Sequence, residues 1–236
     1  MKVTIWGARG SHPTPLTPTQ VKSKISTVLG RLRPEDLRSN ESKERFLGAL
    51  PEWLFGTVGG NTPCVEIVPR SDDRVIIDAG TGLVRFGDAF LSGGDSPPIF
   101  HILFTHFHYD HLQGLPFFVP AYIPKAELHF YSPLPEIESI VTGQMRHPYF
   151  PVTMEDKMTD SIHFHHLKKE EFTIGGARIR WREINHPGRA FAYRIDDGER
   201  SFCHCSDVEL LERDFDRTPK NSAFFQDLDL LVLDTQ

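Results

Sequence analysis

Three histidines and one aspartate lie within six residues near the middle of the chain, at His106, His108, Asp110 and His111. Imidazole nitrogens and carboxylate oxygens are the groups with which proteins bind zinc, iron and manganese. A single histidine is usually structural or exposed, but the spacing His-x-His-x-Asp-His seldom arises by chance and therefore indicates a metal site. No helical spacing relates these histidines, so the motif differs from the two-histidine helix of zinc proteases.

The residues on either side of this motif predict how it is held. Residues 99–104 form an apolar run of strand length, and residues 112–116 could open a helix. The ligand-type side chains would then lie on a tight loop that leaves the end of a buried strand. Binding sites are often built on such loops because the sheet beneath them is rigid.

Length and composition limit the class of protein. The chain has 236 residues, of which 39% are hydrophobic and 25% charged, which suits one large or two small globular domains. Its net charge of −6 argues against broad binding to long nucleic acids, although a small phosphate ester held by metal stays compatible. Cys64, Cys203 and Cys205 are too few for a disulfide framework. With no signal peptide and no run of membrane-spanning length, we expect a cytoplasmic protein without a membrane partner.

Hydrophobic patterning predicts that strands dominate the chain, with helices between them. The expected strands cover residues 3–6, 64–68, 75–77, 99–104, 127–131, 172–174, 177–184, 190–195, 200–205 and a final buried strand at 228–233. The expected helices cover residues 83–91, 135–145 and 208–215. Three further histidines, His163, His165 and His166, are expected at surface or strand positions.

The segment 14–56 differs in character from its surroundings. Thr17 and Gln20 predict a helix start, and a second helix should end near Pro51. The segment is rich in charge of both signs, with Lys22, Lys24, Arg31, Arg33, Arg38, Lys43 and Arg45 against Glu35, Asp36, Glu41, Glu44 and Glu52. We interpret it as a solvated helical insertion; an arm that grips substrate or forms a dimer is the alternative.

Several motifs together resemble the metallo-β-lactamase fold superfamily. They are a first Val-Thr-Ile-Trp-Gly strand, Gly59-Gly60-Asn61-Thr62, Asp78-Ala79-Gly80-Thr81-Gly82, the His106–His111 motif, Asn185-His186-Pro187-Gly188, and Ser206-Asp207 after a later strand. Residues 108–116 look closest to the branch of ribonuclease Z and related phosphodiesterases. The resemblance implies an α/β fold, a four-layer αββα sandwich in one domain over residues 1–236, with residues 14–56 inserted after the first strand.

The resemblance also implies a ligand set for two divalent metal ions. His106, His108 and His186 would hold the first ion, Asp110 and His111 the second, and Asp207 would bridge both. Zinc is the expected metal, with manganese or iron as alternatives. Two ions about 3.5–4 Å apart would convert water to a hydroxide that attacks the substrate. Asp110 would also be catalytic, orienting that water or taking its proton, and Asp78 would orient a metal-binding histidine.

Two positions favour phosphodiester hydrolysis within this superfamily. Position 108 is His, where the diiron redox members carry Glu, and position 207 is Asp, where many true β-lactamases carry Cys. We therefore predict a phosphodiesterase that acts on cyclic nucleotides or RNA ends. A lactone or ester hydrolase on the same site, or a degenerate metal-binding module, is the alternative. A homodimer is also expected from this branch.

Some polar residues near the expected site stay unassigned or uncertain in role. His12 and His147 are candidates for contact with substrate, and alternation in a strand explains Cys203 and Cys205 better than metal ligation does. His204 should point opposite to both cysteines. Superfamily members usually supply a last histidine beyond the final strand. The sequence offers no candidate after residue 233, which predicts either a truncated C-terminus or a second ion held by Asp110, His111, Asp207 and water.

Overall fold

Two β-sheets form the body of the protein in the computed structural model, which describes residues 1–56, 60–94 and 98–234. Gly59 of the Gly-Gly-Asn-Thr motif lies outside these ranges. The first sheet has the order β1 (Lys2–Gly7), β2 (Cys64–Val68), β3 (Val75–Ile77), β4 (Ile99–Leu103), β5 (Glu127–Ser132) and β6 (Ser161–His166). The second has the order β11 (Leu230–Leu233), β10 (Ser201–Cys205), β9 (Ala190–Asp196), β8 (Ala177–Ile184) and β7 (Glu171–Ile174).

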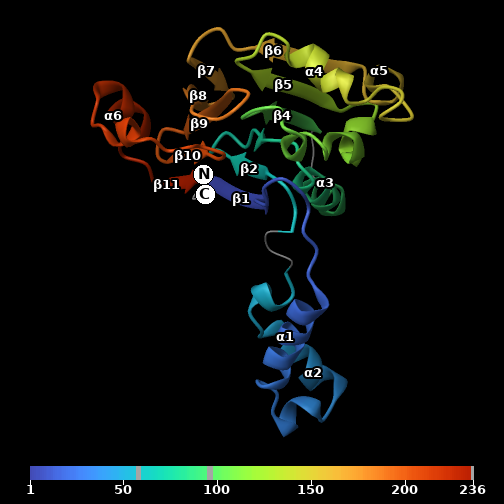
Figure 1. Ribbon diagram of the computed structural model, residues 1–236. Helices are drawn as coiled ribbons and strands as arrows, with labels where there is room; N and C mark the ends of the chain where they lie inside the picture. The colour runs from blue at the N-terminus through green and yellow to red at the C-terminus, as the bar shows by residue number, and fades with distance from the viewer. Residues whose placement is uncertain (57–59, 95–97, 235–236) are drawn as a thin grey trace.

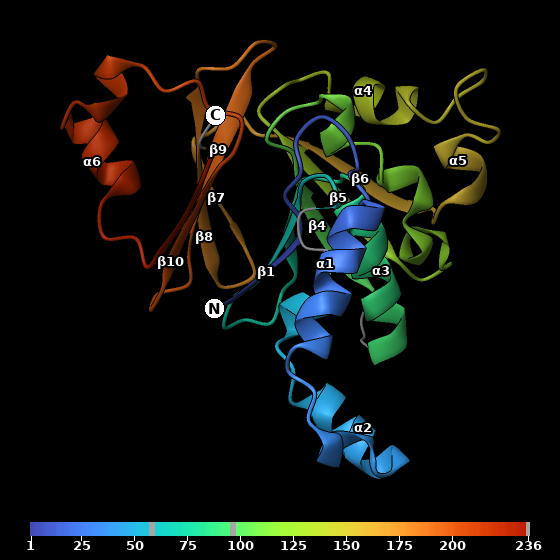
Figure 2. The same cartoon turned by 60° about the horizontal axis from the view of Figure 1, so that its bottom comes forward.

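Helices cover the outer face of each sheet and give four layers. The first sheet is covered by α3 (Gly82–Gly93), α4 (Ile137–Gly143) and α5 (Met154–Lys157), and the second by α6 (Pro219–Phe225) (Figures 1 and 2). The order helix, sheet, sheet, helix confirms the predicted αββα sandwich. No described helix is both long and apolar enough to cross a membrane.

Alternation along β4 divides its side chains between two apolar cores. Phe100 and Ile102 pack with Phe86 of α3 on the helix side, and Leu103 packs into the core between the sheets. Each of these side chains is at most 1% exposed, and burying a side chain of this size stabilises the fold by about 1.5–3 kcal/mol. The strand is therefore a rigid base for the loop that follows it.

Parallel pairing brings the ends of several strands to one edge of the first sheet. Strands β3, β4, β5 and β6 are parallel, so the Asp78 loop after β3 lies beside the His106 loop after β4. The second sheet is hydrogen-bonded to the residues that join β4 to the His106 loop. The Phe191 amide donates to the Thr105 carbonyl at 2.8 Å, and the Tyr193 hydroxyl donates to the Phe104 carbonyl at 2.8 Å.

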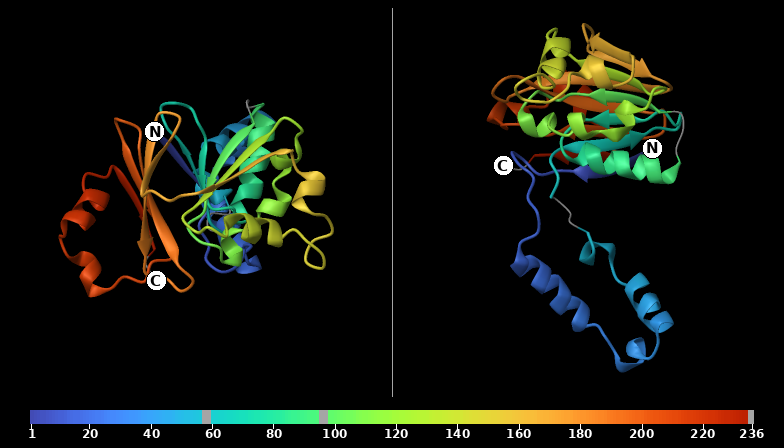
Figure 3. Two further views of the ribbon diagram at one scale, coloured as in Figure 1. Left: turned by 90° about the horizontal axis from the view of Figure 1, so that it is seen from above. Right: turned by 90° about the vertical axis from the view of Figure 1, so that its right-hand side faces the viewer.

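The predicted helical insertion is present and projects from the body as an arm (Figures 1 and 3). It contains α1 (Pro18–Leu29), α2 (Asn40–Gly48) and two 3-10 turns, Pro34–Leu37 and Glu52–Leu54. Thr17 caps α1 by accepting from the Gln20 amide, and Lys24 Nζ donates to the Gly56 carbonyl at 2.6 Å. No residue of α1 is buried, so this helix depends on its caps rather than on a core.

Three predictions of local structure were wrong. The helix expected after residue 112 is replaced by the 3-10 turns Leu115–Phe117 and Val119–Tyr122, because Pro116 and Pro120 lack the amide hydrogen that a helix needs. The helix expected over 208–215 is only a 3-10 turn, Glu212–Phe215. The last strand, β11, is not buried: Leu230 and Leu231 are 45% and 42% exposed because β11 is an edge strand with one partner, β10.

Candidate metal centre

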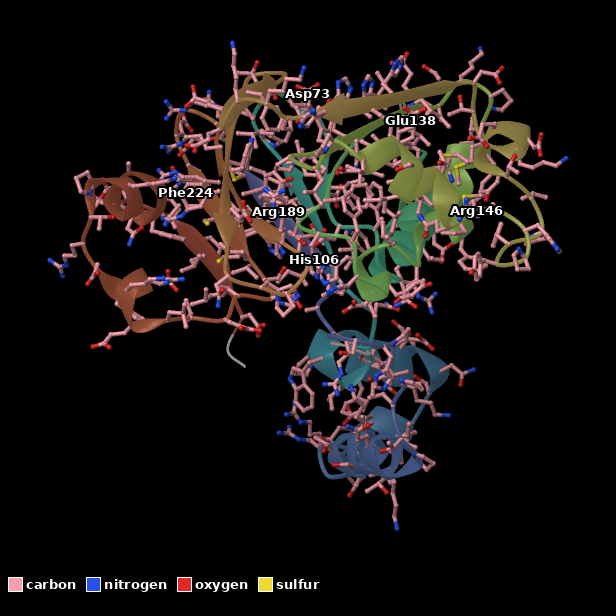
Figure 4. The ribbon with its side chains drawn as sticks, turned by 45° about the horizontal axis from the view of Figure 1, so that its top comes forward. Asp73, His106, Glu138, Arg146, Arg189 and Phe224 are labelled. Atoms are coloured by element: carbon pink, nitrogen blue, oxygen red, sulfur yellow. The ribbon has the colours of Figure 1, made fainter. Side chains whose placement is uncertain are left out.

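The first group of ligand atoms joins both sheets. The loop after β4 carries His106 and His108, and the loop after β8 carries His186. His108 Nδ1 lies 3.0 Å from His106 Nε2 and 3.2 Å from His186 Nε2. Nitrogens this close can share one ion at the usual Zn–N distance of about 2.0–2.1 Å. Figure 4 shows His106 where the sheets approach each other, above the root of the arm.

The second group contains His106, His111 and Asp207, whose ligand atoms lie within 4.8 Å of one another. His111 Nε2 is 3.3 Å from Asp207 Oδ2 and 3.6 Å from Asp110 Oδ2. This nitrogen is fully buried and makes no hydrogen bond to the described residues. A buried imidazole nitrogen that faces two carboxylates is a position that a cation would satisfy, so these residues fit a divalent metal.

A buried network orients His111. Asp78, which is 0% exposed, accepts hydrogen bonds from the Thr105 amide at 2.8 Å and the Thr105 hydroxyl at 2.8 Å. Its Oδ2 atom also lies 2.8 Å from His111 Nδ1. With Nδ1 held by Asp78, Nε2 of His111 faces the centre, where a bound cation would take the place of its proton. This contact is the one expected of Asp78 in its predicted orienting role.

The loop after β1 reaches the same place. The Ser11 amide donates to Asp110 Oδ2 at 2.8 Å, across 99 residues of sequence. Asp110 is 8% exposed, so this bond fixes the direction of a carboxylate with little access to water. The root of the arm is thereby tied to the centre.

The charges of the centre depend on one another. Burial alone would lower the pKa of His111, but the carboxylates of Asp78 and Asp207 raise it to about 10. Burial would raise the pKa of Asp207, but its contact with His111 holds it well below the usual range. Burial, reinforced by repulsion from His111, lowers the pKa of His106 to about 4, so His106 is a neutral imidazole with a lone pair to offer.

Unusual backbone conformations gather around the centre. Four residues other than glycine have positive φ there: Ser11 at 65°, Asp78 at 64°, Arg189 at 68° and Asp207 at 53°. Such conformations are uncommon for residues with a side chain and concentrate at functional sites. Two of these residues, Asp78 and Asp207, have carboxylates that lie beside the two ring nitrogens of His111.

His204 is a neighbour of the centre to which the sequence assigned no role. It is 3% exposed, and neither ring nitrogen has a hydrogen-bond partner among the described residues. Burial lowers its pKa, and its charge interacts with those of Asp78, His111 and Asp207. No spacing marked it, because its position depends on how the two sheets pack.

The remaining candidates are not brought into the centre. Cys203 and Cys205 pack with Val208 and Phe224 on the outer face of the second sheet, as alternation predicted. His12 and His147 are exposed, and neither belongs to a ligand group formed by the described residues. Their predicted contact with substrate stays a prediction. The structure thus brings together His106, His108, Asp110, His111, His186 and Asp207, and their roles as ligands stay predictions.

Comparison with known proteins identifies the family. Residues 73–236 match the model of the beta-lactamase superfamily domain, so the chain belongs to this superfamily, whose members are mostly hydrolytic enzymes. The predicted family is thereby confirmed. No curated protein sequence matches the chain.

Several solved structures share the fold. Zn²⁺-bound PqqB from Methylobacterium extorquens is 14% identical with a TM-score of 0.61, and the match covers 100% of this chain and 71% of that one. A diphosphatase of the PhnP family is 17% identical with a TM-score of 0.55, covering 97% and 71%. The short form of human tRNase Z is 15% identical with a TM-score of 0.54, covering 98% and 76%. At these identities the likeness concerns the fold.

Proposed function

We propose that the chain is a metal-dependent hydrolase of phosphodiesters, with cyclic nucleotides or RNA ends as its substrates. The observation that carries the proposal is the convergence of ligand-type side chains from three loops of two sheets. Five of them form two groups that share His106, and Asp110 lies beside His111. Such a set suits zinc, with manganese or iron as alternatives.

The ligands divide between two divalent ions. His106, His108 and His186 would hold the first ion, Asp110 and His111 would hold the second, and Asp207 would serve both. When bound, paired ions of this kind lower the pKa of water to near neutrality and offset the negative charge of phosphoryl oxygens.

The chain's own residues position these groups and move the proton. Asp78 and Thr105 fix the orientation of the His111 ring, which keeps Nε2 directed at the centre. Asp110, with one oxygen fixed by the Ser11 amide, orients the attacking water and accepts its proton. Because the His108 side chain is exposed, we expect substrate to approach the centre from the side of the loop that carries His108.

The choice of phosphodiesters rests on two residue types and on the neighbours in fold. His108 replaces the Glu of redox members, and Asp207 replaces the Cys of many β-lactamases. A PhnP-family diphosphatase and tRNase Z are among the proteins with the same fold, which supports phosphorus–oxygen esters as the first substrates to assay. The predicted homodimer and cytoplasmic setting stay predictions.

The test is a substrate panel with protein of known metal content. We expect zinc- or manganese-loaded protein to hydrolyse bis-p-nitrophenyl phosphate and cyclic nucleotides. Asp110→Asn should abolish turnover, whereas Asp88→Asn, a change on the exposed face of α3, should not. Turnover of lactones or carboxylic esters alone would select the alternative hydrolase. Silence across both panels with two ions bound, or less than one tightly held ion per chain, would refute the proposal.

A further inference from the structure

The arm, residues 14–56, leaves much of its apolar surface uncovered. Among its described residues, only Leu54 is a buried hydrophobic residue, at 5% exposure. Seven large apolar side chains of the arm have exposed fractions between 38% and 61%: Val21, Ile25, Leu29, Leu37, Leu47, Trp53 and Phe55. Figures 1 and 3 show that the arm stands clear of the two sheets, so the body of the same chain does not cover these residues.

The apolar residues of α1 lie along one side of the helix. Val21, Ile25 and Leu29 follow one another at intervals of four residues, which places their side chains in a stripe. Such a stripe normally packs against another surface. The rest of the arm does not fill this role, because a hollow of about 380 Å³ lies between the turn after α1, at Arg31, and α2, at Phe46.

Helices as short as these depend on packing. α1 has 12 residues and α2 has nine, and neither contains a buried residue. Isolated helices shorter than about 12–15 residues are marginal in water, and most of the stability of a helix in a protein comes from packing of its apolar face. The folded arm therefore indicates a second surface that covers its stripe.

The distribution of charge favours another copy of the arm as this surface. Residues 14–34 contain four basic residues and no acidic one, whereas residues 35–56 contain five acidic and three basic residues. In a two-fold contact, the first half of each arm can lie on the second half of the other. Opposite charges then meet, and both halves contribute exposed apolar side chains to the contact.

We propose that the arm is a dimerisation element, and that the arms of two copies of this chain pack on each other as an intermolecular helical bundle. In this bundle the stripe of α1 in each copy covers the exposed apolar residues between positions 37 and 55 of the other copy. The resemblance to the family predicted a homodimer without an interface, and this proposal assigns one. It does not depend on the proposed phosphodiesterase activity.

The test is sedimentation-velocity ultracentrifugation of the full-length protein over a range of micromolar concentrations. We expect the wild type to be a dimer. The double variant Ile25→Gln, Leu29→Gln should raise the dissociation constant of the dimer at least about 10-fold, because it removes apolar contact from the interface. Both side chains are exposed within one copy, so circular dichroism should be unchanged. The matched control is Ile5→Gln, since Ile5 and Ile25 are both 55% exposed but Ile5 lies on β1 of the body.

Two further measurements test the charge and the proximity of the arms. Lys22→Glu should weaken the dimer, whereas Lys125→Glu, in an exposed turn of the body, should not. The three native cysteines are buried, so a spin label can be attached selectively to Ser26→Cys on α1. Labels on the two copies should couple strongly, because packed helices lie about 8–10 Å apart. Labels on Ser139→Cys of α4 should lie farther apart.

Three results would overturn the proposal. The first is a wild type that stays monomeric over the whole concentration range. The second is a dimer that the double variant of α1 and Ile5→Gln affect equally. The third is a double variant that remains a dimer but loses affinity for a short single-stranded RNA, because the arm would then serve substrate rather than dimerisation.

Discussion

The metal centre has two halves, and they are held in different ways. The first sheet contributes His106, His108, Asp110 and His111, and the second contributes His186 and Asp207. On the first sheet, the Ala79 amide donates to the His111 carbonyl at 2.8 Å and the Gly114 amide to the Ala79 carbonyl at 2.9 Å. The two loops approach so closely that a Cβ on Gly80 would lie 2.3 Å from the Asp110 carbonyl oxygen. Apart from the exposed His108, the ligand-type side chains of this half are buried, and hydrogen bonds within the protein orient them.

The half on the second sheet has fewer constraints. Asp207 has a side chain that is 25% exposed, and His186 is half-buried on a loop. The Glu209 amide donates to the Asn185 carbonyl at 2.8 Å, and Asn185 Nδ2 donates to the Glu209 carbonyl at 3.1 Å. These bonds join the two loops to each other rather than to the first sheet. The contrast leads us to expect that the first half is preformed and that the second half becomes ordered when metal binds.

The largest effect is expected from Asp207→Ala, which removes the carboxylate that we propose as a ligand of both ions. At least one metal position should become empty, and activity should fall more than about 100-fold, beyond the usual cost of losing a supporting residue. Metal analysis after dialysis measures the first quantity. Unchanged metal content would refute the bridging role of Asp207.

Substitution of Asp78, the residue that contacts His111 from behind the centre, should lower metal affinity by a smaller factor. Asp78→Asn keeps the shape of the side chain but weakens the acceptor for His111, so metal affinity should fall about 10–100-fold. Asp72→Asn is the matched control, because Asp72 also has a positive φ, 62°, but lies in the hairpin turn between β2 and β3. If both variants bind zinc equally well, Asp78 does not orient a ligand.

Removal of metal should affect the two halves unequally. After chelation, we expect amides in residues 185–189 and 206–209 to exchange hydrogen several-fold faster, because metal ligands supply much of their restraint. Amides in residues 105–111 should change little, since hydrogen bonds within the first sheet hold them. Equal acceleration in both regions would show that neither half is preformed.

The smallest effect concerns the bond that joins the sheets. Tyr193→Phe leaves the buried Phe104 carbonyl without its donor and should lower the free energy of unfolding by about 1 kcal/mol, with a modest loss of metal affinity. The control is Tyr122→Phe, whose hydroxyl donates to the Pro116 carbonyl at 2.6 Å on the first-sheet side. It should lower stability to a similar extent without altering metal affinity, as urea unfolding and zinc titration would show.

The preformed half was also the half that sequence reasoning described best. His106, His108, Asp110 and His111 lie within six residues, so their approach follows from one loop after one strand. His186 and Asp207 could be joined to them only through the resemblance, because their position depends on the packing of the sheets. The bond from Ser11 to Asp110 and the place of His204 were not predictable for the same reason.

The secondary-structure elements that the sequence analysis missed or misjudged, α6, β6 and β11, each have a physical explanation. The helix α6 has a sequence signal that was overlooked: Thr218 caps it and Pro219 occupies its first position. Strand β6 was not predicted because one of its faces carries His163 and His165 instead of apolar residues. The exposure of β11 is a matter of which neighbour covers it, and a strand's own pattern does not contain that information.

The most direct test is a crystal structure of the zinc-loaded protein with anomalous data at the zinc edge. We expect two peaks about 3.5–4 Å apart, one within bonding distance of His106, His108 and His186, the other of Asp110 and His111, and both of Asp207. Zinc bound elsewhere, or His186 and Asp207 turned away from the ions, would contradict the assignment of this centre.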